Sequence, residues 1–266
     1  MSDPLTVFTR KRATLHQRVI EALVRLFLGL GDWRDPRLFV SQAVPLIQGA
    51  QTALVALIDA YIAALLSRDL DTPVAPVGVD PGPIIAATRG DVTAEDVYTR
   101  PLHTVWSALG EDRPLIQAVE LGATRAREIA ETDLQITHAR AAREAMTGSS
   151  AASNVTGWRR VLKGETSCAL CVIASTQRYT VEQLNPIHPG CDCEVAPITG
   201  RDRHVIDRKL LDAAQAATKD LLGFHPTREQ LRNVTLQIAR EHGEHGTVLV
   251  NPRHRFTGPG DIPTIQ

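Results

Sequence analysis

The sequence LIQAVELGATRAREIAETDLQITHARAAREAM occupies residues 115–146. Its apolar residues, among them Val119, Ala126, Ile129 and Leu134, recur every three or four positions, which is the period of one helix face. Acidic and basic residues alternate on the opposite side, where pairs three or four apart stabilise a helix. The stretch therefore predicts one long amphipathic helix whose Ala-rich face packs against other helices.

The residues before it predict two more long helices. Apolar residues recur at helical spacing from Leu5 to Leu30 and from Pro36 to about Leu66, and Pro45 marks a kink or a start in the second segment. Residues 38–58 are uncharged, which raises a membrane question, but their Ser, Thr, Gln and Pro residues favour a buried bundle helix. We therefore expect a helical N-terminal region and no membrane partner.

Composition supports the same fold class. The chain has 266 residues, 43% hydrophobic and 22% charged, so it is long enough for a sizeable core and wholesale disorder is excluded. Aromatic residues are only 4%, and the net charge is −1, which removes the charge signature of a dedicated nucleic-acid binder. The opening residues contain no secretory signal, and we expect a soluble, intracellular protein.

Turn signals divide the chain into three expected parts. The Gly/Ser-rich tract 147–154 ends the helical pattern, which predicts a helical region 1–147, a Cys/His module 154–200, and C-terminal helices with a tail over 201–266. Residues 71–83 hold four prolines and predict an extended connector. The capping box at 93–96 predicts a helix interrupted at Pro101. Overall, the sequence predicts a mainly α fold with a small α+β module.

The third part has its own signals. Residues 205–222 return to helical spacing, and the capping box 227–230 predicts a further helix that ends at Gly243. Residues 248–250 predict a short strand.

All four cysteines lie between residues 168 and 193. They form the pairs Cys168-x-x-Cys171 and Cys191-x-Cys193, and His188 precedes the second pair. A Cys-x-x-Cys turn directs two thiolates at one centre, and residues two apart on an extended segment share a face. These five side chains are therefore candidate ligands for four places of a structural zinc site, closed by four cysteines or by three cysteines and His188.

Three other interpretations of the cysteines stay open. Disulfides between the two segments would fasten a hairpin in an oxidising setting or in a particle that leaves the cell. Reduced, packed thiols without metal are a second alternative, and a redox-active Cys-x-x-Cys is a third, although no thioredoxin-like βαβ pattern surrounds it.

Residues 158–198 resemble the phage Mu F-like minor head protein domain, which has an aromatic-led segment, a Cys pair and a His-Pro-x-Cys-x-Cys ending. The matching residues here are Trp158-Arg-Arg-Val-Leu, Cys168-x-x-Cys171, Tyr179, Asn185-Pro-Ile-His-Pro-Gly-Cys-Asp-Cys193 and Pro197. Asp192 stands where the family has a basic residue, which argues against a nucleic-acid role for that position. The whole chain also looks like actinobacteriophage head proteins, some of which carry the label capsid maturation protease.

The resemblance implies a low-copy virion protein made in the host cytoplasm and placed inside the phage head near the portal. It further implies that the protein attaches to the portal and other head proteins through its N-terminal helices and influences DNA packaging or ejection. Packaged DNA is a further candidate partner, through Arg159, Arg160 and Lys163, although a solvated turn is the simpler interpretation of these three residues.

The residues do not predict an enzyme. No Gly-x-Ser-x-Gly occurs, and Ser149, Ser150 and Ser153 lie in the Gly/Ser-rich tract, where we expect linker residues. Glu241-His-Gly-Glu-His245 is not a His-Glu-x-x-His zinc motif, and we expect a solvated helix end there. We therefore expect a structural minor head protein without catalytic residues. The alternative is a maturation peptidase that cleaves capsid or scaffold protein, with Cys168 or Cys171 acting with His188.

Overall fold

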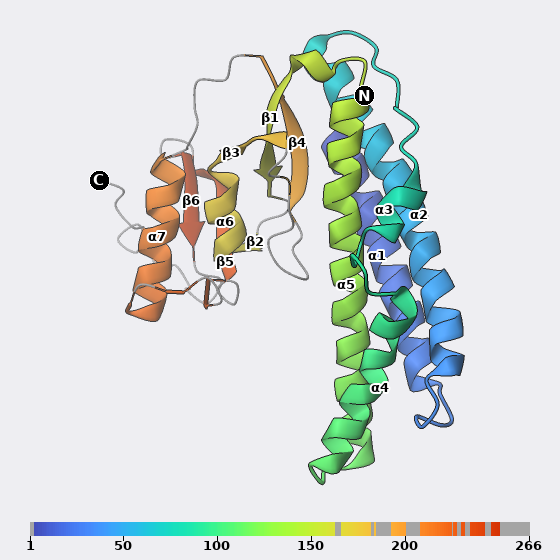
Figure 1. Ribbon diagram of the computed structural model, residues 1–266. Coiled ribbons are helices and arrows are strands. Elements are labelled where there is room, and N and C mark those ends of the chain that lie inside the picture. Colours follow the sequence, from blue (N-terminus) through green and yellow to red (C-terminus); the bar gives the residue numbers. More distant parts are fainter. Residues whose placement is uncertain are drawn as a thin grey trace. The chain divides into compact units, whose positions relative to one another are not determined.

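Figure 1 shows a computed structural model of the chain. It describes residues 3–162, 166–181, 184, 193–200, 208–224, 226–227, 230–231, 235–242 and 246–250. The chain divides into two compact units: residues 1–153 with 184–190 form the helical unit, and residues 154–183 with 191–266 form the strand unit. The described residues are mainly α-helical with a small α+β part.

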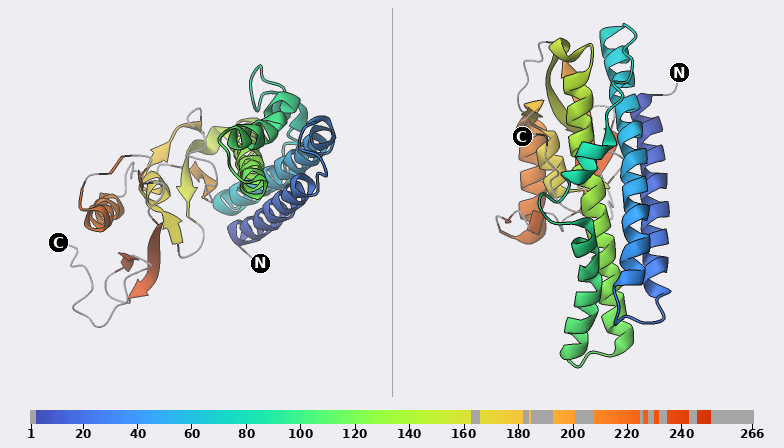
Figure 2. Two further views of the ribbon diagram at one scale, coloured as in Figure 1. Left: turned by 90° about the horizontal axis from the view of Figure 1, so that it is seen from below. Right: turned by 45° about the vertical axis from the view of Figure 1, so that its right-hand side comes forward.

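Four long helices lie along one another in the helical unit (Figures 1 and 2). These are α1 (Pro4–Leu28), α2 (Arg37–Leu70), α4 (Ala94–Gly110) and α5 (Leu115–Gly148), with the short helix α3 (Pro81–Ala86) between α2 and α4. Helix α5 contacts each of the other four, so it is the central element of the unit. The sequence predictions for α1, α2 and α5 are confirmed to within a few residues.

The core of the helical unit combines alanines of α5 with larger side chains of the other helices. Helix α5 buries eight alanines, whereas α1 and α2 contribute buried Leu, Ile, Val and Phe side chains. Small residues on one helix allow its neighbours to approach closely, and larger side chains then fill the remaining space. Gly122 of α5 is the extreme case, because a Cβ atom there would lie 2.6 Å from both Phe27 Cζ and Val105 Cγ2.

The segment between α2 and α4 is fastened to the bundle by a buried carboxylate. Asp59 of α2 accepts hydrogen bonds from the backbone N–H groups of Val77 (2.9 Å), Gly78 (2.7 Å) and Val79 (3.1 Å). Such bonds satisfy both the carboxylate and a stretch of chain that no regular element supports. The extended connector predicted over 71–83 is therefore correct in part, because α3 already begins at Pro81.

Helix α4 begins as predicted but continues past its proline. Thr93 Oγ1 accepts a hydrogen bond from the N–H of Asp96 (3.1 Å), which is the predicted N-cap. The predicted interruption at Pro101 is wrong, because α4 is continuous from Ala94 to Gly110. Pro101 removes only one helical donor, and the burial of Leu102 and Val105 in the core holds the next turn in place.

The described residues of the strand unit form two three-stranded antiparallel sheets. One has the order β3–β1–β4, from Arg178–Tyr179, Val155–Val161 and Glu194–Thr199, and the other has the order β2–β5–β6, from Thr166–Cys168, Thr235–His242 and Gly246–Val250. The one-turn 3₁₀ helix Ala152–Asn154 leads into β1. Helices α6 (Ala169–Ser175) and α7 (Arg208–Leu222) pack together through Ala169, Val172 and Ala214.

The C-terminal part differs from the sequence prediction at one element. The capping box at 227–230 forms, since Gln230 Oε1 accepts from the N–H of Thr227 (2.9 Å) and Thr227 Oγ1 accepts from the N–H of Gln230 (3.4 Å). However, the helix predicted to run to Gly243 is wrong, because Thr235–His242 is strand β5. This strand pairs with β2 on one side and β6 on the other, and sheet pairing of this kind outweighs a local helical signal. The strand predicted over 248–250 is confirmed within β6.

Among the described residues, one helix is long and apolar enough to cross a membrane by length and composition. This is α2, whose apolar window has a mean hydropathy of 1.7 and is 61% buried inside the helical unit. Burial of this kind is typical of the core helix of a bundle, so the window carries little weight for a membrane span.

Candidate functional site

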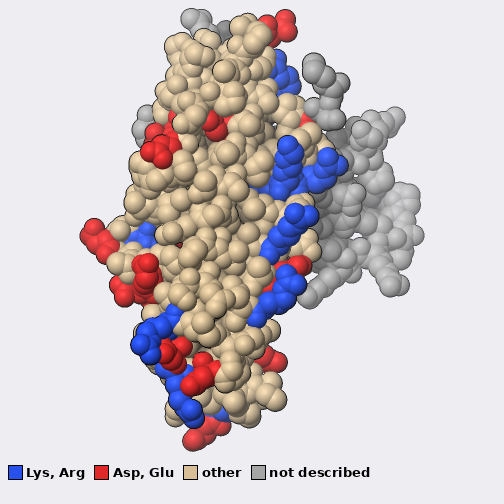
Figure 3. Space-filling model, turned by 90° about the vertical axis from the view of Figure 1, so that its right-hand side faces the viewer, with Lys and Arg blue, Asp and Glu red and all other residues tan. Residues whose placement is uncertain are grey.

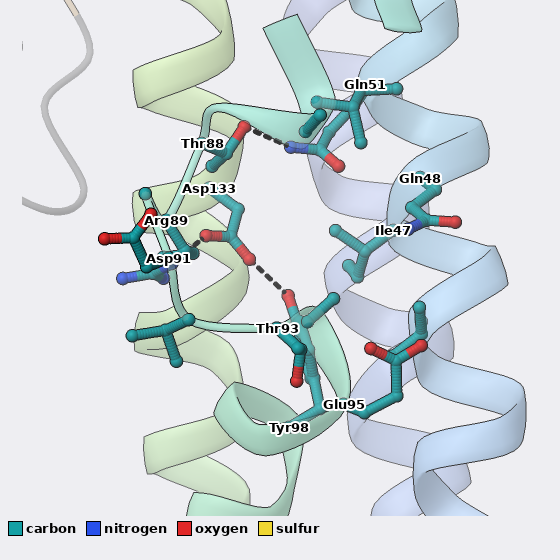
Figure 4. Close-up of a pocket in the computed structure, with 16 residues that line it drawn as sticks. Ile47, Gln48, Gln51, Thr88, Arg89, Asp91, Thr93, Glu95, Tyr98 and Asp133 are labelled. Carbon is teal, nitrogen blue, oxygen red and sulfur yellow. Dashed lines mark hydrogen bonds and ion pairs between the residues drawn. The ribbon is translucent and has the colours of Figure 1, made fainter. Parts of the chain in front are cut away.

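The helical unit contains a polar cavity of about 300 Å³ between α2, α4, α5 and the segment that joins α3 to α4 (Figure 4). We call it the polar cavity. The side chains that line it and carry polar atoms are Gln48, Gln51, Thr88, Arg89, Asp91, Thr93, Glu95, Tyr98 and Asp133. Cavities with a few convergent polar groups are the usual place to look for a binding site.

Asp133 of α5 is the centre of the polar cavity. Its carboxylate forms an ion pair with Arg89 Nε and accepts a hydrogen bond from the Tyr98 hydroxyl (2.9 Å). Arg89 also donates through Nη2 to the carbonyl oxygen of Ile129 (3.0 Å). The three side chains therefore join α5, α4 and the α3–α4 segment, as Figure 4 shows.

Burial changes the acidity of this cluster. Asp133 is only 4% exposed, and loss of solvation raises the pKa of its carboxyl group above the ordinary value, although Arg89 and Tyr98 act in the opposite direction. Burial and the neighbouring carboxylate of Asp133 also raise the pKa of Tyr98, so the phenol stays protonated and donates its hydrogen bond. In this cluster the buried carboxyl group of Asp133 therefore contacts one proton donor, the Tyr98 hydroxyl, and one cation, Arg89.

A second set of hydrogen bonds lies beside it. Gln51 Nε2 donates to Thr137 Oγ1 (2.8 Å) and to Thr88 Oγ1 (3.3 Å), and all three side chains are buried. Thr88 and Thr137 in turn donate to carbonyl oxygens one turn earlier, of Ile84 and Asp133. The Gln51 amide nitrogen and the two threonine hydroxyls therefore join α2 to α5 and to the residues after α3, which is a structural role.

The sequence contained only a weak signal for the polar cavity. Asp133 interrupts the apolar face of the 115–146 helix, and a charged residue at a core position requires a buried partner. Nothing in the local pattern identifies Arg89 and Tyr98 as that partner, because they precede Asp133 by 44 and 35 residues. Arg89, Tyr98 and Asp133 are therefore not among the site residues predicted from the sequence.

The first cysteine pair lies at the start of helix α6. Cys168 is the last residue of β2 and the N-cap of α6, and its Sγ accepts a hydrogen bond from the N–H of Cys171 (3.3 Å). Cys168 is half-buried and Cys171 is buried. An N–H to sulfur bond across a Cys-x-x-Cys turn suits thiolates that share a metal, so this half of the predicted donor set fits zinc.

Cys193 lies in a different environment, next to strand β4. Its Sγ accepts a hydrogen bond from Arg160 Nη1 (3.3 Å), and the Arg160 guanidinium lies 4.9 Å from the centre of the Trp158 ring. Trp158 stacks on Tyr179 with ring centres 4.6 Å apart, and Trp158 is fully buried. The register of β1 with β3 and β4 explains this cluster, since Trp158 and Arg160 share a face of β1 with the facing residues of both neighbours.

This cluster changes the interpretation of two basic residues. Arg160 is 9% exposed and packs on Trp158, so the predicted solvated turn is wrong for this residue and its side chain is a core element of the sheet. Arg159 lies on the same strand and is exposed, whereas Lys163 falls outside the described residues. Burial raises the pKa of Tyr179, and Arg160 beside it acts in the opposite direction. Trp158 is fully buried in the sheet, whereas Trp106 is partly exposed.

Within the described part of the chain, no group of three or more His, Cys, Asp and Glu side chains is placed to hold a metal ion. None of Cys168, Cys171 and Cys193 forms a disulfide with another of the three. His188 and Cys191, the other two predicted ligands, lie outside the described residues. The zinc site therefore stays a prediction.

The remaining sequence candidates fall in structural positions. Ser149 and Ser150 lie directly after α5, where Ser149 Oγ accepts from the N–H of Ala151 (3.1 Å), and Ser153 lies in the 3₁₀ helix Ala152–Asn154. Glu241 lies in strand β5, so the predicted solvated helix end is wrong, and His245 falls outside the described residues.

Comparison with known proteins gives one match. A family model described as VG15 protein matches residues 98–217, which run from α4 through the Cys segment to α7. This is a family of phage proteins, and the match supports a phage protein. No curated protein and no solved structure matches the chain.

Proposed function

We propose that this chain is a minor structural protein of a phage head, which binds the portal or a neighbouring head protein and takes part in head assembly or in DNA packaging or ejection. The observation that carries the proposal is the match to a phage protein family over residues 98–217. The matched range contains the whole segment 158–198 that resembles the Mu F-like head domain.

The interior of the helical unit supports a binding role rather than a catalytic one. Asp133 of the polar cavity pairs with Arg89 and with Tyr98. Beside them, Gln51 of α2 donates a hydrogen bond to Thr137 of α5. A catalytic group must lie within reach of a reacting atom of the substrate, whereas these contacts join elements of the fold. We assign the polar cavity to the rigidity of the bundle, which suits a docking unit.

The strand unit has the role of a compact module in this proposal. The Trp158–Arg160–Tyr179 cluster gives one of its two sheets a core, and the Cys168-x-x-Cys171 turn lies where the other sheet meets α6. We propose that a structural zinc ion, held by four of Cys168, Cys171, His188, Cys191 and Cys193, fastens this module. A closed four-ligand site adds folding free energy and leaves no coordination position for catalysis.

Reconstitution with head proteins tests the proposal. The chain is co-expressed with the portal protein and with the major capsid protein of its own phage, and the mass of the portal assembly is measured with and without it. A portal assembly or capsid intermediate that gains a small, fixed number of copies supports the proposal. Assemblies whose mass is the same in both preparations overturn it.

A cleavage assay separates the peptidase alternative. Purified chain is incubated with capsid precursor, and Cys168→Ser and Ser150→Ala variants are run beside it. Specific cleavage that one substitution abolishes would replace the structural proposal with a maturation peptidase, and intact precursor in all three reactions supports the structural role.

A further inference from the structure

One exposed face of the helical unit carries no charge over most of its length. Helix α2 has charged residues only at Arg37, Asp59, Arg68 and Asp69, and Asp59 is buried under the connector. The exposed residues between Arg37 and Arg68 are all uncharged: Leu38, Ser41, Gln42, Pro45, Gln48, Gly49, Thr52, Ala53, Ala56 and Ala60. At 1.5 Å per residue this uncharged band, from Leu38 to Ala60, is roughly 33 Å long. An exposed helix face normally carries charges, so such a band indicates an interaction surface.

The band also allows close approach. Gly49, Ala53, Ala56 and Ala60 lie three or four residues apart, which places them along one side of α2. Where the band meets the C-terminal half of α1, the surface is hollowed into a groove of about 660 Å³. Leu26, Leu30, Leu38 and Leu46 are among the residues that line this groove. A groove of this kind accepts the ridge of side chains of another helix.

A row of basic residues borders the band. Lys11, Arg18 and Arg25 of α1 are exposed and seven residues apart, so they form one line along the helix. None of the three forms an ion pair with a carboxylate of the described residues. Figure 3 shows this face, with Lys and Arg side chains in a row beside a long uncharged surface.

We propose that the α1–α2 outer face, defined by the uncharged band and by Lys11, Arg18 and Arg25, binds an amphipathic helix of another protein. The partner helix has a stripe of small or apolar residues and carboxylates at seven-residue spacing along one flank. This inference rests on the proposed docking role of the helical unit, and it adds the face and the chemistry of the partner. The stripe lies on the band, and the carboxylates pair with the basic row.

Charge arguments select this partner over a second copy of the chain. In an antiparallel two-fold pairing of α2 with its copy, the same flanks meet, so the two basic rows would lie side by side and repel each other. In a parallel pairing, each row would meet the flank of the copy's α2 that lies away from α1, where the exposed residues of α2 between Arg37 and Arg68 offer no carboxylate. A partner helix with an acidic flank places its small or apolar stripe on the uncharged band and its carboxylates against the basic row.

The composition of the band argues against a membrane. A helix that lies in a lipid interface presents large apolar side chains such as Trp, Phe and Leu. The band presents Ser41, Gln42, Gln48 and Thr52 together with glycine and alanine. Anionic lipid would satisfy the basic row but would leave these polar side chains in an apolar layer.

Co-purification with cognate head proteins, followed by a charge-reversal comparison, tests the inference. The variant carries Lys11→Glu, Arg18→Glu and Arg25→Glu, and the control carries the same charge change at exposed positions of α4, the α4–α5 turn and α5: Arg100→Glu, Arg113→Glu and Arg127→Glu. Removing three surface pairs and adding like charges should weaken binding roughly tenfold or more, whereas the control should bind like wild type. An Ala53→Trp variant should also lose binding because the ring blocks helix approach, and thermal melts establish that every variant is folded.

The outcomes separate the two proposals. If a head protein binds wild type and the first triple variant equally, the inference is wrong and the proposed function stands. If no head protein binds wild type, the proposed function is wrong. A designed Ala-rich helical peptide with Glu at seven-residue spacing then decides the inference, which requires it to bind at least tenfold more tightly than the same peptide with Lys. Binding of wild type to anionic vesicles, or a dimer that Ala53→Trp dissociates, would assign the face to lipid or to a second copy and overturn the inference.

Discussion

Replacing Gly122 by alanine should destabilise the helical unit, although alanine is the better helix former. Gly122 lies within α5, and Phe27 of α1 and Val105 of α4 cover it from two sides. An added Cβ atom would lie 2.6 Å from Phe27 Cζ, 2.6 Å from Val105 Cγ2 and 2.9 Å from Phe27 Cε1. Both neighbours are fully buried, so neither side chain can swing into solvent.

Two opposing contributions decide the sign of the change in the free energy of unfolding of Gly122→Ala. An alanine in place of a mid-helix glycine contributes about 0.5–1 kcal/mol of stability. To restore the ordinary contact distance of 3.4 Å, the neighbours must move by about 0.8 Å, and overpacking of this kind costs about 1–3 kcal/mol. Because two buried side chains must move together, we expect the upper part of that range and a net loss of about 1–2 kcal/mol.

Gly49→Ala is the matched control. Gly49 lies in the middle of α2, and a Cβ atom there meets nothing within 4 Å, so only the conformational term remains. We expect this variant to gain about 0.5–1 kcal/mol. Urea unfolding of the full chain, followed by far-ultraviolet circular dichroism, measures both variants because the helical unit contributes most of the helical signal.

The double variant Gly122→Ala/Val105→Ala checks the mechanism. Val105→Ala removes one of the two side chains that meet the new methyl group, so the double variant should lose less stability than the sum of the single variants, by at least 0.5 kcal/mol. A Gly122→Ala protein that is stabilised as much as Gly49→Ala would refute the close packing of α1 and α4 on α5.

Four further outcomes follow from the structure. Asp133→Ala should lose about 1–3 kcal/mol in urea unfolding, because the Tyr98 hydroxyl and Arg89 lose their buried acceptor; since the folded pKa of Asp133 is raised, wild type should lose stability as pH rises from 4 toward that pKa, and the variant should lack this slope. Asp59→Ala should lose about 1–3 kcal/mol and speed proteolysis of the α2–α3 connector, because three backbone N–H groups lose their acceptor. Arg160→Ala should lose about 1–3 kcal/mol and change the fluorescence of the tryptophan under its guanidinium, with an unchanged emission spectrum contradicting the stacking. Elemental analysis should find about one zinc ion per chain that Cys171→Ser removes, and chelator should lower the melting temperature of wild type but not of that variant.

Local patterns predicted the helices because each helix is stabilised by residues near one another in sequence. Helices α1, α2 and α5 follow their apolar periodicity, and Thr93 forms the cap that its capping box predicts. The local proline rule failed at Pro101, where burial of the following turn outweighs one missing hydrogen bond. The capping box at 227–230 shows the same limit, because the local motif forms while the next segment joins a sheet.

The residues of the candidate site could also be predicted only where they lie close together in the sequence. The Cys168-x-x-Cys171 turn was predictable because its two thiols are three residues apart, and the structure adds the N–H to sulfur bond between them. The Asp133 cluster was not predictable, because its three members come from separate elements that only the packed bundle brings together. The same holds for Arg160, whose sequence position next to Arg159 gives no sign that one is buried and the other exposed.

Buried polar groups also decide which face of α2 stays open. Asp59 binds the connector at residues 77–79, Gln51 binds Thr88, and Asp133 binds Arg89, so the segment from α2 to α4 is held at three points along its length. Two of these polar side chains, Asp59 and Gln51, belong to α2 and the third, Asp133, belongs to α5, and accordingly α3 contacts α2 and α5. A segment held on that side cannot also cover the side of α2 next to α1. The same contacts that make the bundle rigid therefore leave the uncharged band exposed, which is why we look for its partner outside the helical unit.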